Sequence, residues 1–456
     1  MSETVRQAKA ILKNEKGMAM VLVLLVLVVI VIMGLSMMAM AANNMRMGTV
    51  ERSYQSAYYI AEAGATARLN EMSPAIRAVY KNAATRDSFF SGIDSALELG
   101  VEKSYTDFEE SFGDKPVAKV KIEKLASDTI ISYTMDYKIT STGMINNRKR
   151  TVSRVVHVSW KPKSVVNIPA DTVLFGKDSI VISNTPIDGS IATNATKESG
   201  NVKINGNEVN ISDSKVKYDA KTPVNLPPFP GFSVPNTAVN FSGNLLKMNR
   251  DMVFKTFSVN SLTPLTIDVG DYNRNLVVQN LDIQQNGQIT IIGKGKLSIF
   301  AENIKLGSGS VINTGKDLSK LYLFLKGPGT SLDNGLIYGS MYANDLQLSK
   351  NANLAVSVTT GVQGHIITGG TSGIKLSGSP ILYPRMIYAP SATVDLDATF
   401  TGSIIANKII SNGANKTGKY EYVQINYENS PIYVDTGGND TPVQDSIVID
   451  PIRETN

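Results

Sequence analysis

The clearest pattern in the chain is a continuous apolar stretch near its beginning. No Asp, Glu, Lys or Arg occurs from Met18 to Met45, and the run from Met20 to Met33 is dominated by valine and leucine. As a helix this stretch would extend about 42 Å, whereas about 20 residues cross the hydrocarbon core of a bilayer. Valine is a poor helix former in water, but lipid leaves the backbone no other way to satisfy its hydrogen bonds. The pattern predicts a transmembrane helix.

Beyond this stretch the apolar positions become periodic. From Asn43 to about Tyr80 they recur at three- and four-residue steps, which is the spacing of one helix face. The stripe consists of Tyr54, Tyr58, Ala61, Ala65, Leu69 and Met72. We therefore expect one long helix over residues 18–85, whose second half packs a globular domain.

Residues 86–164 are predicted to form a pilin-like antiparallel β region, in which an alternating pattern begins after residue 115. Tyr133, Met135, Tyr137 and Ile139 alternate with polar residues, which is the period of a half-buried strand. The predicted strands are Val117–Glu123, Ile130–Thr142 and Thr151–Trp160, with a turn over Gly143–Asn147. Residues 86–115 show no assignable pattern. We expect a small antiparallel sheet after the helix, with a domain edge at Trp160-Lys161-Pro162.

Residues 165–430 contain an internal repeat. One pattern recurs in Gly189-Ser190-Ile191-Ala192, Gly339-Ser340-Met341-Tyr342-Ala343, Gly364-His365-Ile366-Ile367-Thr368 and Gly402-Ser403-Ile404-Ile405-Ala406. A second register superposes Asn303, Asn344 and Asn407, at separations near multiples of about 21 residues. A repeat of this length cannot bury its apolar face alone and must stack on its neighbours. The pattern predicts a right-handed parallel β-helix (β-solenoid) of roughly a dozen coils.

Two segments fall outside this repeat. The proline-rich stretch Leu226–Gly231 cannot be an interior strand and is expected to be a loop or excursion. Residues 431–456 are predicted to form a C-terminal tail, which is polar and loose from Asp440 onward.

Charge and composition narrow the function classes. The chain has 45 basic and 40 acidic residues, a net charge of +5 and no cysteine. Without cysteine there is no disulfide framework and no thiolate metal site. The densest basic cluster, Arg148-Lys149-Arg150, follows Asn146-Asn147 and is interpreted as the charged flank of a hairpin turn. We expect no specific nucleic-acid partner.

The residues before the apolar stretch leave three interpretations open. Arg6, Lys9, Lys13 and Lys16 should remain in the cytoplasm. The segment is a signal peptide cleaved near Ala39-Met40-Ala41, a plain signal anchor, or a prepilin whose leader, residues 1–17, ends in Lys16-Gly17. The apolar run exceeds the ~7–15 residues of a signal peptide. The continuing helix favours the prepilin.

Residues 16–70 resemble the N-terminal module of PilX-type pilus assembly proteins and prepilin-like proteins. The resemblance is carried by Lys16-Gly17-Met18-Ala19-Met20-Val21-Leu22-Val23-Leu24-Leu25, Glu51-Arg52 and Tyr58-Tyr59-Ile60-Ala61-Glu62-Ala63-Gly64-Ala65. It implies a minor pilin or pseudopilin of a type IV pilus-like or type II secretion-like system. It also implies cleavage after Gly17 by a prepilin peptidase, N-methylation of Met18, and partners that are other pilins and the inner or cytoplasmic membrane.

One residue departs from the pilin pattern. Most pilins carry a glutamate at the fifth mature position, where this chain has Leu22. In a filament that carboxylate compensates the terminal ammonium of a neighbouring subunit in a low-dielectric core. We therefore expect a minor subunit at or near the tip, and not the repeating shaft subunit.

Residues 380–427 resemble the C-terminal β-helical domain of many prepilin-like proteins. The residues that carry this are Ile387-Tyr388-Ala389-Pro390-Ser391-Ala392-Thr393-Val394 and Gly402–Asn407. Such domains usually continue into a His-Tyr-Asp-like stretch, and here the comparable place reads Ile425-Asn426-Tyr427-Glu428. The resemblance implies an external head, displayed on a pilus or the cell surface, for adhesion to a surface glycan or host ligand or for assembly initiation.

Candidate chemistry is sparse. His157, in a strand-like run, and His365, in a repeat turn, are expected to be structural. Asp395 and Asp397 lie two apart, so both could share one strand face; a solvated face is expected there, with calcium binding or catalysis as the alternative. We expect no catalytic residue, cofactor or metal. The alternative functions are a membrane-anchored, cell-surface carbohydrate-active β-helix enzyme and a DNA-uptake pseudopilin.

Overall fold

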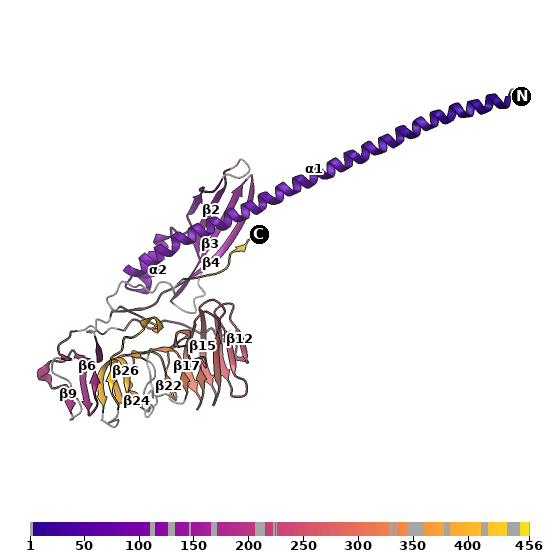
Figure 1. Ribbon diagram of the computed structural model, residues 1–456. Helices are drawn as coiled ribbons and strands as arrows, with labels where there is room; N and C mark the ends of the chain where they lie inside the picture. Colours follow the sequence, from indigo (N-terminus) through magenta and orange to yellow (C-terminus); the bar gives the residue numbers. More distant parts are fainter. Residues whose placement is uncertain are drawn as a thin grey trace.

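A computed structural model provides the fold. It describes residues 3–109, 115–125, 133–145, 147–165, 171–205, 215–221, 224, 226–327, 332, 335–344, 360–377, 384–411, 418–435 and 447–455. For residues 3–17, 164, 165, 205, 377, 434 and 435 it describes the backbone alone. Three parts follow one another (Figure 1): a long helix, a head built around an antiparallel sheet, and a body, residues 171–435, that contains large parallel sheets.

The helix α1 (Glu3–Asn82) is continuous, with Pro74 inside it. Its first half extends away from the rest of the molecule (Figure 1). The second half, from Val50 onward, packs on the head, where Ala57, Ala61 and Ala65 are fully buried. The predicted long helix is thus present, and its end at Asn82 lies close to the expected one.

The antiparallel sheet of the head has the order β1-β2-β3-β4-β29, and β30 also pairs with β4. Its strands are β1 (Glu102–Tyr105), β2 (Val117–Lys124), β3 (Thr134–Ile145), β4 (Arg148–Ser159), β29 (Ile447–Ile449) and β30 (Arg453–Glu454). Burial alternates strictly along β3. Val120, Tyr137 and Val156 form a core with α1. The predicted start of the β3 strand, Ile130, lies outside the described residues.

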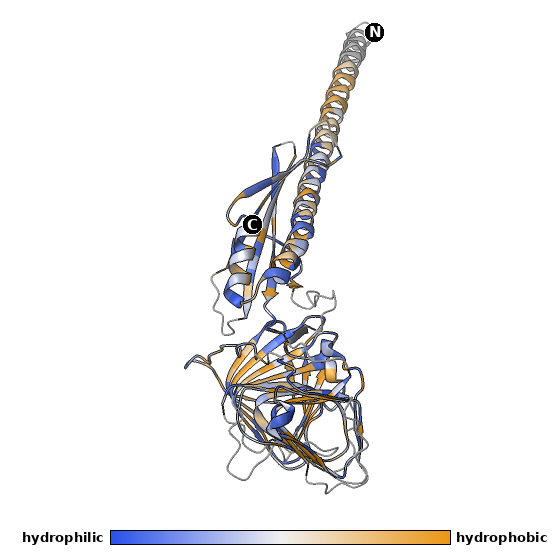
Figure 2. Ribbon diagram, turned by 90° about the vertical axis from the view of Figure 1, so that its left-hand side faces the viewer, coloured by the Kyte–Doolittle hydropathy of each residue, from blue (hydrophilic) through white to orange (hydrophobic). Residues whose placement is uncertain are grey.

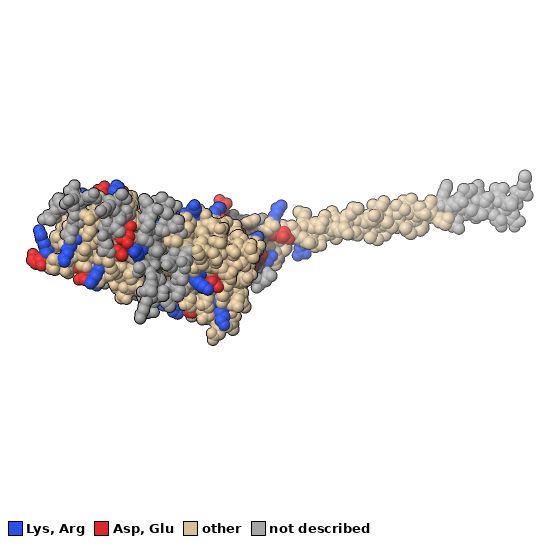
Figure 3. Space-filling model, turned by 90° about the horizontal axis from the view of Figure 1, so that it is seen from below, with Lys and Arg blue, Asp and Glu red and all other residues tan. Residues whose placement is uncertain are grey.

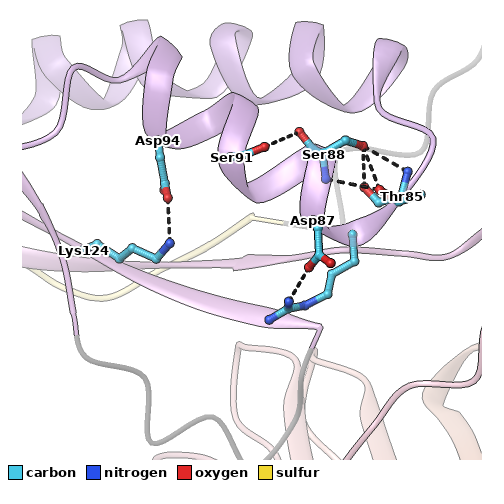
Figure 4. A network of polar contacts seen from close by, with 7 residues as sticks. Thr85, Asp87, Ser88, Ser91, Asp94 and Lys124 are labelled. Carbon is cyan, nitrogen blue, oxygen red and sulfur yellow. Dashed lines mark hydrogen bonds and ion pairs between the residues drawn. The ribbon is translucent and has the colours of Figure 1, made fainter.

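A second helix, α2 (Arg86–Ala96), occupies part of the stretch that had no prediction. Thr85 caps it: the Thr85 hydroxyl accepts from the Ser88 amide, and the Ser88 hydroxyl accepts from the Thr85 amide (Figure 4). An ion pair of 2.6 Å between Lys124 Nζ and Asp94 holds the helix on β2 (Figure 4). The Thr-x-x-Ser spacing before Phe89 and Phe90 was the local signal for this helix.

The expectation of a loose C-terminal tail is wrong for residues 447–455, whereas residues 436–446 lie outside the described residues. Strand β28 (Tyr433–Asp435) pairs with β5 (Lys163–Val165), and β29 and β30 return to the head and pair with β4. Figure 1 shows the C-terminus beside the head sheet. The return completes the edge of β4, whose backbone groups would otherwise be unpaired. Polar composition does not reveal such pairing, because backbone groups make it.

The body consists mainly of two parallel sheets. The long sheet has the order β10-β8-β6-β26-β25-β23-β21-β19-β17-β15-β13-β11, and the second has the order β12-β14-β16-β18-β20-β22. The long-sheet strands are β6 (Thr172–Ser183), β8 (Ser190–Thr193), β10 (Val216–Lys217), β11 (Phe241–Ser242), β13 (Met252–Val259), β15 (Arg274–Ile283), β17 (Leu297–Leu306), β19 (Leu321–Leu325), β21 (Ser340–Ala343), β23 (Ile366–Thr368), β25 (Arg385–Asp397) and β26 (Phe400–Ser411). The second-sheet strands are β12 (Leu245–Lys247), β14 (Leu265–Asp268), β16 (Gln288–Ile292), β18 (Val311–Ile312), β20 (Leu336–Ile337) and β22 (Gly361–Val362). The chain alternates between the two sheets from β11 to β23.

An apolar ladder runs through the long sheet. Its members are Met252, Leu276, Ile299, Leu323, Met341, Ile366, Ile387, Ile404, Leu174 and Ile191, each paired with the next. From Met252 to Ile404 the steps are 24, 23, 24, 18, 25, 21 and 17 residues, so the expected repeat of about 21 residues describes an average. The asparagine register is partly wrong. Ala301 and Ala343 occupy the same position of the stack, because both pair with Leu325, but Asn303 stands two residues after Ala301 and Asn344 follows Ala343 directly.

The stacking order departs from the chain order. Strand β6, the first long strand of the body, pairs with β26, the last one. The chain must then travel to the opposite end of the stack before β11, and residues 226–232, here called the strap, run along the outer face of the sheet. The strap contacts strand after strand. At its start the Tyr342 hydroxyl on β21 donates to the Pro227 carbonyl, and at its end the ring of Phe232 lies 5.6 Å from the ring of Phe300 on β17. The expected excursion at Leu226–Gly231 is therefore a packed crossing.

The junction between head and body is anchored to the end of α1. The Lys163 ammonium donates to the carbonyl of Tyr80 and, at 3.0 Å, to that of Ala83, so it caps the last turn of the helix. The Tyr80 hydroxyl donates to the Lys161 carbonyl at 2.9 Å. Trp160 packs between Tyr80 and Phe89, with ring centroids 5.1 Å and 5.0 Å away. The head and the outer face of the body thereby share one apolar core.

Candidate functional site: an unpartnered apolar helix

Residues 18–45 of α1 form an apolar surface on which no other described part of the chain packs. Met18, Leu22 and Met45 are 69%, 65% and 75% exposed. Figure 2 shows hydrophobic residues over this stretch, and in Figure 3 the described part of it in view carries no charged side chain until close to the head. Full burial of one such apolar side chain is favourable by about 1.5–3 kcal/mol, and this free energy is not gained while the side chain stays in water. The helix contains a segment long and apolar enough to cross a membrane.

The second half of α1 is fitted closely to the head sheet. A β-carbon on Gly64 would lie 2.5 Å from the Ala118 β-carbon and 2.9 Å from the Ser141 hydroxyl. Gly64 belongs to the Ala61-Glu62-Ala63-Gly64 stretch that carries the family resemblance. Small residues are needed there because the helix and the sheet approach each other more closely than larger side chains allow. This packing fixes the direction in which the free half of the helix leaves the head.

A buried arginine ties the helix to the rest of the head. Arg68 is 7% exposed; its Nη2 donates to the Leu97 carbonyl at 2.8 Å, and its Nη1 pairs with Glu71 at 2.9 Å. Glu71 also accepts from Lys103 at 2.7 Å and from Tyr105 at 3.1 Å. Burial acts to raise the pKa of Glu71, but the hydrogen bonds from Lys103, Arg68 and Tyr105 outweigh it and hold that pKa below its usual value.

The basic cluster lies at the predicted hairpin. Ile145 pairs with Arg148 where β3 turns into β4. The guanidinium groups of Arg148 and Arg150 lie 5.0 Å and 4.8 Å from the ring centre of Tyr54 on α1, and Arg150 pairs with Glu454 at 2.7 Å. These cations serve contacts within the head, as the turn interpretation expects.

His157 lies on β4 beside two carboxylates. Its Nδ1 is 2.7 Å from Asp136 on β3, and its Nε2 is 3.5 Å from Asp450 in the C-terminal return. The hydrogen bond with Asp136 raises the pKa of His157 above its ordinary value, although partial burial opposes this. The sequence could not reveal this cluster, because Asp450 is almost 300 residues away from His157.

His365 has a different environment. It is 5% exposed; its Nδ1 accepts from the Met386 amide at 3.0 Å, and its Nε2 donates to the Asn426 carbonyl at 2.9 Å. Burial lowers the pKa of His365 to about 4, so the ring is neutral in the folded protein. This histidine connects two neighbouring strands to the segment 425–429, which agrees with a structural role.

Asp395 and Asp397 share one face of β25, as their spacing predicts. Lys375 pairs with Asp397 at 3.2 Å, and burial together with Asp397 raises the pKa of Asp395. Within the described part of the chain, no cluster of three or more His, Asp or Glu side chains is arranged to hold a metal ion.

Gly17 lies inside α1, directly before the exposed Met18. Cleavage after Gly17 and methylation of Met18 stay predictions.

Comparison with known proteins gives a match for the first part of the chain. Residues 16–66 match the family model described as PilX N-terminal, which confirms the resemblance that those residues indicated. The match ends within the half of α1 that packs on the head.

Among solved structures, the crystal structure of competence-associated pilin ComZ from Thermus thermophilus matches, with 10% identity over 88% of this chain and 98% of that chain. Its TM-score is 0.22, and at this value the likeness carries no argument about this chain. No curated protein is similar enough to match.

Proposed function

We propose that this chain, whose first part is a PilX-type N-terminal module, is a non-enzymatic minor pilin or pseudopilin. In this proposal α1 inserts in the inner or cytoplasmic membrane after synthesis, and the head and body lie outside. Cleavage after Gly17 releases the helix for lateral packing with the helices of other pilins. The observation that carries the proposal is the coincidence of the family match at residues 16–66 with the uncharged, solvent-exposed stretch 18–45 of α1.

The body is best explained as a β-solenoid that the filament displays. Its strands alternate between two parallel sheets, and one apolar ladder connects neighbouring strands from Met252 to Ile191. Repeats of this kind bury their core only by stacking and leave an extended outer surface for ligands. Adhesion or initiation of assembly would use that surface.

Two features support a place at or near the tip. Leu22 replaces the carboxylate through which a shaft subunit compensates its neighbour's terminal ammonium. The long sheet, twelve strands across at ~4.8 Å each, is about 50 Å wide. Packed helices lie only about 8–10 Å apart, so consecutive subunits of a shaft could not each carry such a body.

The test is expression of the full chain with and without a prepilin peptidase, followed by N-terminal sequencing. The proposal expects a mature chain that begins at N-methylated Met18 only in the strain with the peptidase. A chain that keeps residues 1–17, or that starts near Ala42 as a released product, would contradict it. Immunogold labelling tests the position, because an even distribution along purified filaments argues against the tip.

A further inference from the structure

A crevice of about 590 Å³ lies where the head faces the body. Asp136, His157 and Asp450 line its head wall. The body wall is formed by the starts of β13, β15, β17 and β19. Ligand sites of a few hundred Å³ occur preferentially at such domain interfaces.

The body wall repeats from strand to strand. Asn275 pairs with Ser298, and Ser298 pairs with Tyr322. Asp251 extends this polar column, because it accepts from the Asn275 amide at 2.8 Å and from its Nδ2 at 2.7 Å. A parallel apolar column consists of Val253, Val277, Phe300 and Phe324. The crevice therefore presents similar groups at intervals of ~4.8 Å, the distance between neighbouring strands.

The charges in the crevice are mixed. Its carboxylates are Asp136, Asp251 and Asp450, and its basic side chains are Lys161, Arg250, Arg274 and Lys296. A polyanion would meet the carboxylates and a polycation the basic groups, so neither is favoured. Arg274 is 9% exposed, and its Nε lacks a hydrogen-bond partner among the described residues. A buried donor of this kind costs free energy until a ligand or water satisfies it.

We infer that this crevice binds a short oligosaccharide that is neutral or N-acetylated. Sugar hydroxyls are donors and acceptors at once, so carboxylate, amide and guanidinium groups can all pair with them. The carbon face of a sugar ring suits the half-buried ring of Tyr322, and one sugar unit is about as long as the distance between two strands. On the body wall an extended peptide fits less well, because that wall is the face of a sheet; the edge strand that reaches the crevice is the short β29 of the head.

This inference deepens the proposed function by giving the exported head a ligand class, and it rests on that function only for its biological setting. Trp160 is the only tryptophan of the chain and lines the crevice, so its fluorescence reports on occupancy. The full chain in detergent micelles is titrated with chitotetraose, cellotetraose, tetragalacturonate and tetralysine. We expect a saturable change of emission with chitotetraose or cellotetraose and about tenfold weaker binding of both charged tetramers.

Two variants test the site itself. Asn275→Ala removes a polar group of the repeated column and should weaken binding by about tenfold, which corresponds to one hydrogen bond. Ser298→Leu fills the crevice and should abolish binding; thermal melting checks that both variants fold. Asn236→Ala, on an exposed turn outside the crevice, is the matched control and should bind like the unchanged chain.

Several results would overturn the inference: no saturation with either neutral tetrasaccharide, tightest binding of tetralysine or tetragalacturonate, or equal losses in Asn275→Ala and Asn236→Ala. The two proposals fail separately. A chain that is cleaved to Met18 but binds no sugar refutes only the oligosaccharide site. A chain that binds sugar but keeps its first 17 residues refutes only the pilin assignment.

Discussion

Gly143 on β3 lies directly against the backbone of α1 at Ala57. A β-carbon at residue 143 would overlap the Ala57 carbonyl oxygen and the Ala61 amide nitrogen and would sit 3.1 Å from the Ala61 Cα. Backbone atoms cannot yield as a flexible side chain can, so any residue larger than glycine forces the helix and the sheet apart. Together with Gly64 on the helix, Gly143 sets the distance between α1 and the sheet.

Gly143→Ala should therefore destabilise the head. We expect the free energy of unfolding to fall by about 1–3 kcal/mol, the usual cost of overpacking, and the melting temperature of the head to fall with it. Thermal unfolding followed by circular dichroism measures the change. Gly48→Ala is the matched control, because a β-carbon there meets nothing within 4 Å, and alanine favours a helix. Equal melting temperatures for the two variants would contradict the close-packing argument.

The environment of His157 predicts that the stability of the head depends on pH. Its pKa is raised in the folded state, so its contact with Asp136 stabilises the head fully below the unfolded value of about 6.5 and is lost as the pH rises through the folded value. His157→Gln should lower the melting temperature at about pH 5.5 more than at about pH 9. The same decrease at both pH values would show that the charge of His157 contributes nothing.

The environment of His365 predicts the opposite pH dependence for the stability of the body. Its pKa of about 4 lies below the unfolded value of about 6.5, so only the unfolded chain takes up a proton as the pH falls through this range. The body should lose up to about 3 kcal/mol of stability by pH 4, and His365→Gln should remove this loss. Because the chain has two histidines, proton NMR can follow both titrations in one sample. A His365 signal that titrates near 6.5 would refute the buried, neutral ring.

Phe232 should hold the strap on the body. It is 6% exposed, packs edge-on against Phe300, and its carbonyl accepts from Lys326 at 3.3 Å. Phe232→Ala should cost about 3–5 kcal/mol locally and increase amide hydrogen exchange across residues 226–240, while exchange in the head stays unchanged. Leu262→Ala, at a side chain that is 90% exposed, is the control. Unchanged exchange in the Phe232 variant would mean that the crossing is held elsewhere.

Removal of residues 447–456 should damage the head. The deletion leaves the edge of β4 unpaired along Val156–Val158, where β29 now completes the sheet. We expect a lower melting temperature and concentration-dependent aggregation, measured by light scattering. Glu454→Gln removes only the ion pair with Arg150, an exposed contact, and should change stability by less than about 1 kcal/mol. A truncated chain that melts and scatters like the full one would restore the picture of a loose tail.

The elements that could be predicted are those with a local signal. The apolar run from Met18 and the stripe that ends near Tyr80 indicated the long helix, because helical periodicity is visible within a few turns. The hairpin was predicted in the same way, but its turn is shorter than the expected Gly143–Asn147, because β3 continues to Ile145. Asn147 has the positive φ of 63° that such a turn demands. The cap of α2 at Thr85 was an equally local signal, but the polar and irregular residues 86–115 were left without a prediction.

The sequence by itself thus determined the uncharged helix, the antiparallel hairpin and the repeating apolar strands, since each depends on neighbours a few residues away. Only the tertiary structure revealed the stacking of β6 on β26, the return of residues 447–455 to β4, and the crevice between His157 and Asp251. These features join residues from about 90 to 300 positions apart. No local period encodes such contacts, because their free energy arises only when the whole chain is packed.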